Sequence, residues 1–127
     1  TGYLANLRRA DHAVGHLWEF IQGQIPGMAG DTVIIVAPEC GRNDQPNAIV
    51  DENEWFAYDH SGANSLRIFG MMAGPTVPSN LVIGSEGNPQ GSAVDMVPTI
   101  AAIVGIKSEV LGAGLILPGA QSLFDLV

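Results

Sequence analysis

The residues best suited to metal chemistry lie in one polar stretch of the chain, between Glu39 and His60. Oxygens of carboxylates and nitrogens of neutral imidazoles are ligands of zinc and manganese. The stretch is therefore a candidate cation site, with Glu39 and His60 as ligands. Zinc or manganese is expected first, with calcium or magnesium as alternatives. Acids dominate from Glu39 to Asp59, where six of them accompany one arginine: Glu39, Asp44, Asp51, Glu52, Glu54 and Asp59.

The acidic residues and His60 also have an ordinary explanation that involves no metal ion. Acid-rich loops are usually only solvated, and this is the expected state of Asp51, Glu52 and Glu54. For His60, the sequence leaves open whether it is a ligand or a loop histidine with satisfied hydrogen bonds.

Glu39 is less ordinary, because it follows an apolar strand-like run and precedes Gly41-Arg42-Asn43. Loops that follow strands often carry function, and a glycine lets the backbone turn sharply or approach a ligand closely. Arg42, Asn43 and Asp59 are accordingly the candidates for orienting a substrate or the site.

Nucleophilic catalysis is a further hypothesis for the same stretch. Cys40 is the one cysteine of the chain, and Glu39 and His60 are possible partners for a thiol nucleophile. A single cysteine near a strand end is more often a small buried hydrophobic residue. Ser61 and Ser65 lack the context of a nucleophile elbow and receive no catalytic role.

The elements that must position these residues alternate between helix and strand. Apolar residues at three- and four-residue spacing predict an amphipathic helix over residues 4–25, which carries His12 and His16 four residues apart. That spacing alone is more typical of polar-face histidines than of a metal site. Residues 33–37 are apolar on both faces, as in a buried parallel strand.

The rest of the chain predicts shorter elements. Residues 38–62 form a long polar loop, which is uncommon in a compact domain and usually functional. Strands are expected at 66–73 and 80–84, and a helix over 92–104 that begins either at residue 92 or near Pro98. A glycine-rich apolar tail follows from residue 105. The class is α/β.

Composition limits the classes of function. The 127 residues carry a net charge of −8, and their basic residues are scattered, which disfavours nucleic acid as a partner. The longest strongly apolar run, residues 33–37, is far short of the roughly 18 residues of a membrane span. No leader peptide is visible, and one cysteine excludes an internal disulfide framework.

The same composition suggests part of a larger domain. The chain is 46% hydrophobic and only 14% charged, whereas a free-standing small domain usually has about 25–35% charged surface residues. Too few helices are expected to cover both faces of a parallel sheet, and Thr1 in place of Met fits a fragment or a processed product. We therefore expect a single α/β piece over residues 1–127.

Several short motifs resemble the C-terminal portion of the alkaline phosphatase superfamily, in particular its bacterial sulfatase-like branch. These motifs are the strand and turn of residues 31–43, the later Asp59-His60, the run over residues 95–101, and the helix around residues 10–15. Their order and spacing extend over almost the whole chain.

The resemblance implies metal-assisted hydrolysis of small phosphate or sulfate esters, in which metal ions polarise the ester and activate a nucleophile. By position, Glu39 would replace a metal-binding aspartate, and His60 would match the later histidine ligand. Cys40 stands where these enzymes usually have a histidine, and a thiolate can bind zinc. The nucleophile would lie in an N-terminal half that precedes this chain.

The expected fold is thus a partial doubly wound sheet, alkaline-phosphatase-like, from a larger α/β/α domain. The expected function is that of the C-terminal part of a phosphate- or sulfate-ester hydrolase, inactive alone, whose partner is the missing N-terminal half. The alternatives are a non-catalytic binding or structural module of the same fold, and a cysteine hydrolase that uses Cys40, Glu39 and His60. An exported or periplasmic parent protein is compatible with this interpretation.

Overall fold

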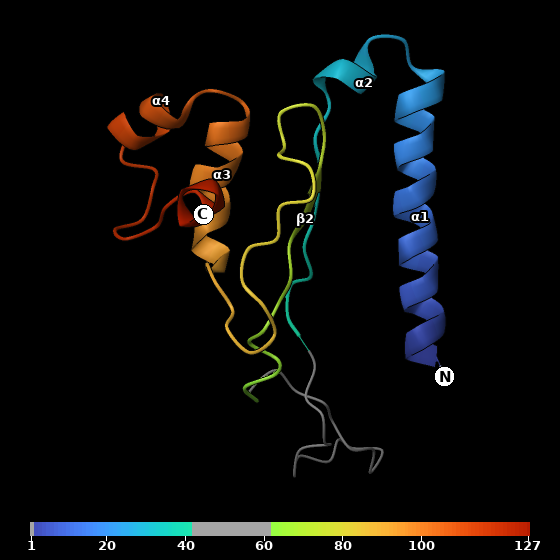
Figure 1. The fold of residues 1–127 in the computed structure, drawn as a ribbon, viewed down its shortest axis with the longest axis horizontal. Coiled ribbons are helices and arrows are strands. Elements are labelled where there is room, and N and C mark those ends of the chain that lie inside the picture. The colour runs from blue at the N-terminus through green and yellow to red at the C-terminus, as the bar shows by residue number, and fades with distance from the viewer. Residues whose placement is uncertain (1, 42–61) are drawn as a thin grey trace, which may run out of the picture. The chain divides into compact units, whose positions relative to one another are not determined.

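The structure is a computed structural model that describes residues 2–41 and 62–127 (Figure 1). The chain forms two compact units, Thr1–Val77 and Pro78–Val127, and each is described by itself. The described residues contain helices and one pair of short strands. This mixed content agrees with the expected α/β class at that coarse level.

The first unit begins with helix α1, Gly2–Gln24, which confirms the helix predicted over residues 4–25. The helix is straight in the view of Figure 1. It ends where Pro26 and Gly27 follow, and Gly27 has a φ of 86°, a conformation that glycine adopts without strain. The short helix α2, Met28–Asp31, then leads toward the first strand.

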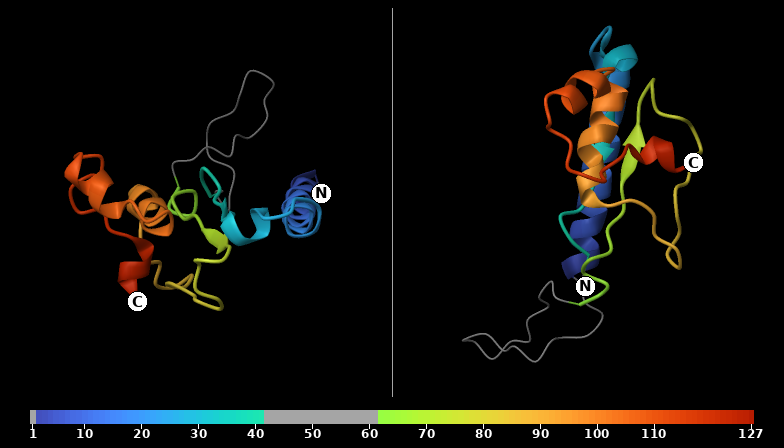
Figure 2. Two further views of the ribbon diagram at one scale, coloured as in Figure 1. Left: turned by 90° about the horizontal axis from the view of Figure 1, so that it is seen from above. Right: turned by 90° about the vertical axis from the view of Figure 1, so that its left-hand side faces the viewer.

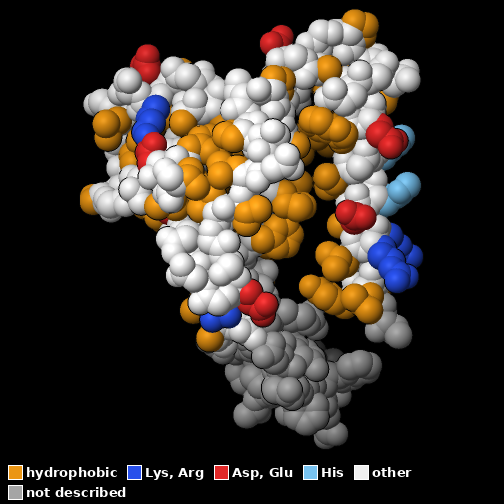
Figure 3. Space-filling view, viewed as in Figure 1, with side chains coloured by type: hydrophobic (Ala, Val, Ile, Leu, Met, Phe, Trp, Pro, Cys, Tyr) orange, Lys and Arg blue, Asp and Glu red, His pale blue; other side chains and the backbone are white. Residues whose placement is uncertain are grey.

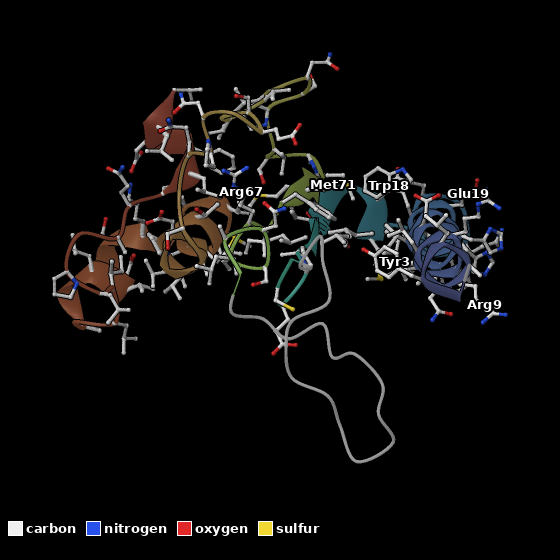
Figure 4. All side chains as sticks on the ribbon, turned by 90° about the horizontal axis from the view of Figure 1, so that it is seen from below. Tyr3, Arg9, Trp18, Glu19, Arg67 and Met71 are labelled. Carbon is white, nitrogen blue, oxygen red and sulfur yellow. The ribbon has the colours of Figure 1, made fainter. Side chains whose placement is uncertain are left out.

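Helix α1 has two chemically different faces. Apolar side chains line one of its edges, and charged and histidine side chains line the other (Figure 3). Tyr3 and Trp18 project from one side of the helix, and Arg9 and Glu19 from the other (Figure 4). This is the pattern that a 3.6-residue period predicts.

The apolar face of α1 is covered only near its C-terminal end. Ile21 is 6% exposed and is the buried residue of the helix. Leu4 and Leu7, near the other end, are 59% and 50% exposed. The described residues of the first unit therefore bury this face in part.

The first unit also contains strands β1, Ile34–Val36, and β2, Met71–Ala73, which pair antiparallel with Ile35 opposite Met72. The strand predicted at residues 33–37 is confirmed, but parallel pairing is wrong for this pair. An apolar run indicates that both faces of a strand can be covered, and it says nothing about the direction of the neighbouring strand. The three β1 residues are each half-buried.

Of the other two predicted strands, one is confirmed in part and one is wrong. Of residues 66–73 only β2 is a strand, and residues 80–84 form no strand. Leu66 and Phe69, in the apolar run before β2, are 76% and 53% exposed.

The second unit contains two α-helices and two short 3-10 helices. Helix η1, Ala93–Asp95, leads into α3, Met96–Ile103; α4, Lys107–Gly112, and η2, Leu123–Leu126, follow. Helices α4 and η2 each contact α3, and they lie beside it in the views of Figure 2.

Proline determines where α3 can begin. Pro98 lies in the first turn of α3, where its missing N–H is not needed for a helical hydrogen bond. The structure thus combines the two predicted starts, with a 3-10 turn from residue 93 that continues into α3. The predicted tail from residue 105 contains α4 and η2, which glycine-rich composition does not predict.

The longest strongly apolar run of the sequence is too short to predict a membrane-spanning segment. Across residues 2–41 and 62–127, no helix combines the length and the hydropathy needed to cross a bilayer.

Candidate functional site

The candidate site begins three residues beyond the carboxyl end of β1. Glu39 is exposed there, and Cys40 beside it is half-buried and forms no disulfide. Both predicted residues therefore come within four residues after the strand that the sequence indicated. An exposed carboxylate can bind a cation without first breaking buried contacts, because its oxygens are already in solvent.

Gly41 connects this strand end to a second segment of the first unit. Its N–H donates to the Ser65 carbonyl oxygen over 2.8 Å. Ser65 is 2% exposed, and its hydroxyl donates to the Gly62 carbonyl oxygen over 2.6 Å. The turn at residues 62–65 is thereby closed and lies against the chain that leaves β1.

Only glycine fits at position 41. A Cβ atom there would overlap the Asn64 carbonyl oxygen and lie 2.5 Å from the Arg67 carbonyl oxygen, and both of these are backbone atoms. The close approach explains the glycine of the Glu39-Cys40-Gly41 run by packing. Whatever chemistry the neighbouring side chains perform, Gly41 acts here through its backbone.

This contact brings together the described residues on either side of residues 42–61. Gly41 is the last described residue before the segment, and Gly62 is the first one after it. The hydrogen bond from Gly41 to Ser65 therefore brings the described residues on either side of residues 42–61 together.

Of the predicted site residues, the structure describes Glu39 and Cys40, which are neighbours in sequence. Arg42, Asn43, Asp59 and His60 lie outside the described residues. Within the described residues, no three side chains of histidine, cysteine, aspartate or glutamate come together as a metal-binding group. The predicted ligand set is therefore untested as a constellation.

A buried acid in the second unit has a packing role that the residue pattern alone did not assign. Asp95 is 6% exposed, and its Oδ2 accepts a hydrogen bond from Ser92 N–H over 2.7 Å. Its Oδ1 accepts from Gln121 N–H over 2.9 Å. With both oxygens bound to backbone donors, Asp95 holds the segment before η2 against the start of α3.

Thr99 extends the same network by one helical turn. This fully buried residue donates its hydroxyl to the Asp95 carbonyl oxygen over 2.6 Å and accepts from Leu123 N–H over 2.8 Å. The Ser92-x-x-Asp95 spacing is that of an acid that bonds back to a helix N-cap, and this signal could have revealed the structural role. The bonds to Gln121 and Leu123 carry no comparable local signal.

The described part of the site therefore presents one exposed carboxylate and one half-buried thiol after a strand, beside a turn that Gly41 and Ser65 hold closed. A carboxylate and a thiol can both bind a divalent cation, and a thiol can act as a nucleophile. Comparison of the chain with protein-family models, with curated proteins and with solved structures found no match.

Proposed function

We propose that residues 1–127 are the C-terminal part of a metal-dependent hydrolase of phosphate or sulfate esters. In this proposal the domain is a doubly wound α/β/α sheet of the alkaline phosphatase type. The chain contributes part of the metal site, and the nucleophile comes from a preceding part of the same polypeptide.

One observation carries the proposal, the hydrogen bond that joins Gly41 to the turn at residues 62–65. Gly41 N–H bonds to Ser65, so the described residues that flank residues 42–61 lie together beside Glu39. His60 stands two residues before Gly62, as Glu39 stands two residues before Gly41. The contact between the two flanks supports a site that draws ligands from both ends of the segment.

Glu39 and His60 would hold the metal ion, and Cys40 is a third candidate ligand. Carboxylate, imidazole and thiolate together suit zinc, and without the thiolate they also suit manganese. A bound ion would polarise the ester oxygen and stabilise the charge that develops on it. Arg42, Asn43 and Asp59 would orient the ester.

A binding module of the same fold is the second candidate. Cys40 stands where the resembled enzymes usually have a histidine ligand, and a changed ligand favours loss of catalysis. The thiol in that position also keeps the cysteine hydrolase, with Cys40, Glu39 and His60, as an outcome to be tested.

Calorimetric titration with Zn²⁺ and with Mn²⁺ tests the metal site in the chain as it stands. We expect Glu39→Gln and His60→Ala each to weaken binding by at least about tenfold, since each removes a ligand. Glu109→Gln is the matched control, because Glu109 is an exposed carboxylate on α4 in the second unit. If the unchanged chain and the three variants all bound each metal ion with equal affinity, the proposed site would be overturned.

Hydrolysis assays with p-nitrophenyl phosphate and p-nitrophenyl sulfate separate the candidates. The proposal expects no turnover by residues 1–127, and metal-dependent turnover once the preceding part of the polypeptide is present. Metal-dependent binding without turnover in that longer protein would favour the binding module. Turnover that needs no metal and is lost in Cys40→Ser would identify a cysteine hydrolase.

A further inference from the structure

We propose that His12 and His16 form a second, surface site on α1 that binds a divalent transition-metal ion, Cu²⁺ most strongly. The sequence alone left these residues as polar-face histidines. The structure adds the continuity of the helix, the exposure of both side chains and, within residues 2–41 and 62–127, their lack of competing partners.

The helix sets the geometry of the pair. Both histidines lie well inside α1, Gly2–Gln24, with more than a turn of helix on either side. Residues four apart on a helix have Cβ atoms about 5–6 Å apart on the same face, which lets two imidazoles reach one ion. Metalloprotease helices use this same spacing of two histidines to bind zinc. The histidine side chains on α1 lie next to each other on its polar edge (Figure 3).

Both imidazoles are also available. His12 and His16 are exposed. Across the described residues, neither side chain has a hydrogen bond or an ion pair. Binding an ion would therefore break no hydrogen bond or ion pair that the described part of the chain makes, and the helix already holds the two side chains near each other.

The neighbouring charges set the strength of the site. Arg8 and Arg9, about one turn before His12, oppose a cation, whereas Glu19, less than one turn after His16, favours it. Among the described residues, Glu19 does not complete a three-residue metal group with the histidines. The site thus has two protein ligands and leaves the other coordination positions to water. Copper exceeds nickel and zinc at nitrogen sites of this kind.

This site is independent of the one proposed at Glu39 and His60. It uses other ligands, and both of them stand on one regular helix. Each site can be measured in a protein that lacks the other. The His12→Ala/His16→Ala protein keeps only the site proposed at Glu39 and His60, and the Glu39→Gln/His60→Ala protein keeps only the site on α1. Failure of one proposal therefore leaves the other testable.

Calorimetric titration of the Glu39→Gln/His60→Ala protein with CuCl₂ tests the inference. We expect one ion per chain, and at least tenfold weaker binding after adding either His12→Ala or His16→Ala. A matched variant, Ala13→His with His16→Ala, keeps the number of histidines but places them adjacent in sequence. Adjacent residues point about 100° apart on a helix, so this variant should also bind at least tenfold more weakly.

A second measurement does not depend on calorimetry. An ion held by both histidines links two turns of α1, so Cu²⁺ should raise the helical circular dichroism signal in the starting protein and leave it unchanged in the rearranged variant. NiCl₂ and ZnCl₂ should act more weakly, and MgCl₂ should have no effect, since Mg²⁺ prefers oxygen ligands. Equal copper affinity in the starting and the rearranged proteins would overturn the inference.

Discussion

Gly41 shows how a single position can connect packing to a candidate site. Its backbone lies against the carbonyl oxygens of Asn64 and Arg67, and its N–H bonds to Ser65. Glu39 and Cys40 stand immediately before it. Any shift of the chain at Gly41 would therefore move the residues that we propose as metal ligands.

We expect Gly41→Ala to destabilise the first unit by about 2 kcal/mol, because the added methyl group overlaps backbone atoms that cannot rotate away. Urea unfolding followed by circular dichroism measures the loss. Gly15→Ala is the control, since a Cβ at that position in α1 meets nothing within 4 Å. It should stabilise the helix by about 0.5–1 kcal/mol. Destabilisation of similar size by both changes would contradict the packing argument.

Sequence reasoning located Glu39 and Cys40 at a strand end because the apolar run of residues 33–37 is a strong local signal. It could not show that Gly41 meets Ser65, because that contact joins residues far apart in sequence. The long-range part of the role of Asp95 was missed for the same reason. One of its two donors, Ser92, is local, and the other, Gln121, is 26 residues away.

Helix α1 carries an apolar stripe whose covering changes along its length. Ile21 is 6% exposed, and Leu7, on the same stripe, is 50% exposed. The hydrophobic contribution of a side chain depends on the area that it removes from water. Two similar residues on one helix should therefore contribute very differently to stability.

Ile21→Ala should lower the free energy of unfolding by about 2–4 kcal/mol, as expected for a large-to-small change at a buried site. Leu7→Ala should change it by less than about 1 kcal/mol, because that side chain is half exposed in the folded chain. Urea denaturation compares the two variants. A larger loss for Leu7→Ala would mean that its end of the helix is covered in solution.

Among the elements, regular periodicity was the most reliable guide. The period of α1 is maintained over more than twenty residues, and the predicted helix matches the observed one closely. The direction of β1–β2 pairing depends on which strand lies alongside, and no local pattern records that. Helix α4 and the 3-10 helix η2 were missed because their glycine-rich surroundings hide a short helical signal.

At the scale of the whole molecule, apolar surface is the main feature. Among the described residues, the buried hydrophobic side chains are Ile21 and Ala101, while large apolar side chains are exposed in both units. Extensive exposed apolar surface usually marks a site of association. This agrees with the proposal that the chain belongs to a larger domain.

We therefore expect residues 1–127 to self-associate, and to do so more strongly as salt is raised. A net charge of −8 opposes association, and salt screens that repulsion while the apolar attraction persists. Sedimentation velocity at low and high NaCl measures this. Leu4→Gln with Leu7→Gln should reduce association, because both side chains are at least half exposed. A chain that stays monomeric at high salt would contradict the expectation.

The network of Asp95 and Thr99 also bears on how the chain folds during synthesis. These two residues stand at the start of α3, but part of their hydrogen bonding comes from Gln121 and Leu123, more than twenty residues later. When α3 has just emerged from the ribosome, the N–H donors of Gln121 and Leu123 have not yet emerged. The second unit can therefore complete its core only after residue 123 has emerged, which places its final folding step late in translation.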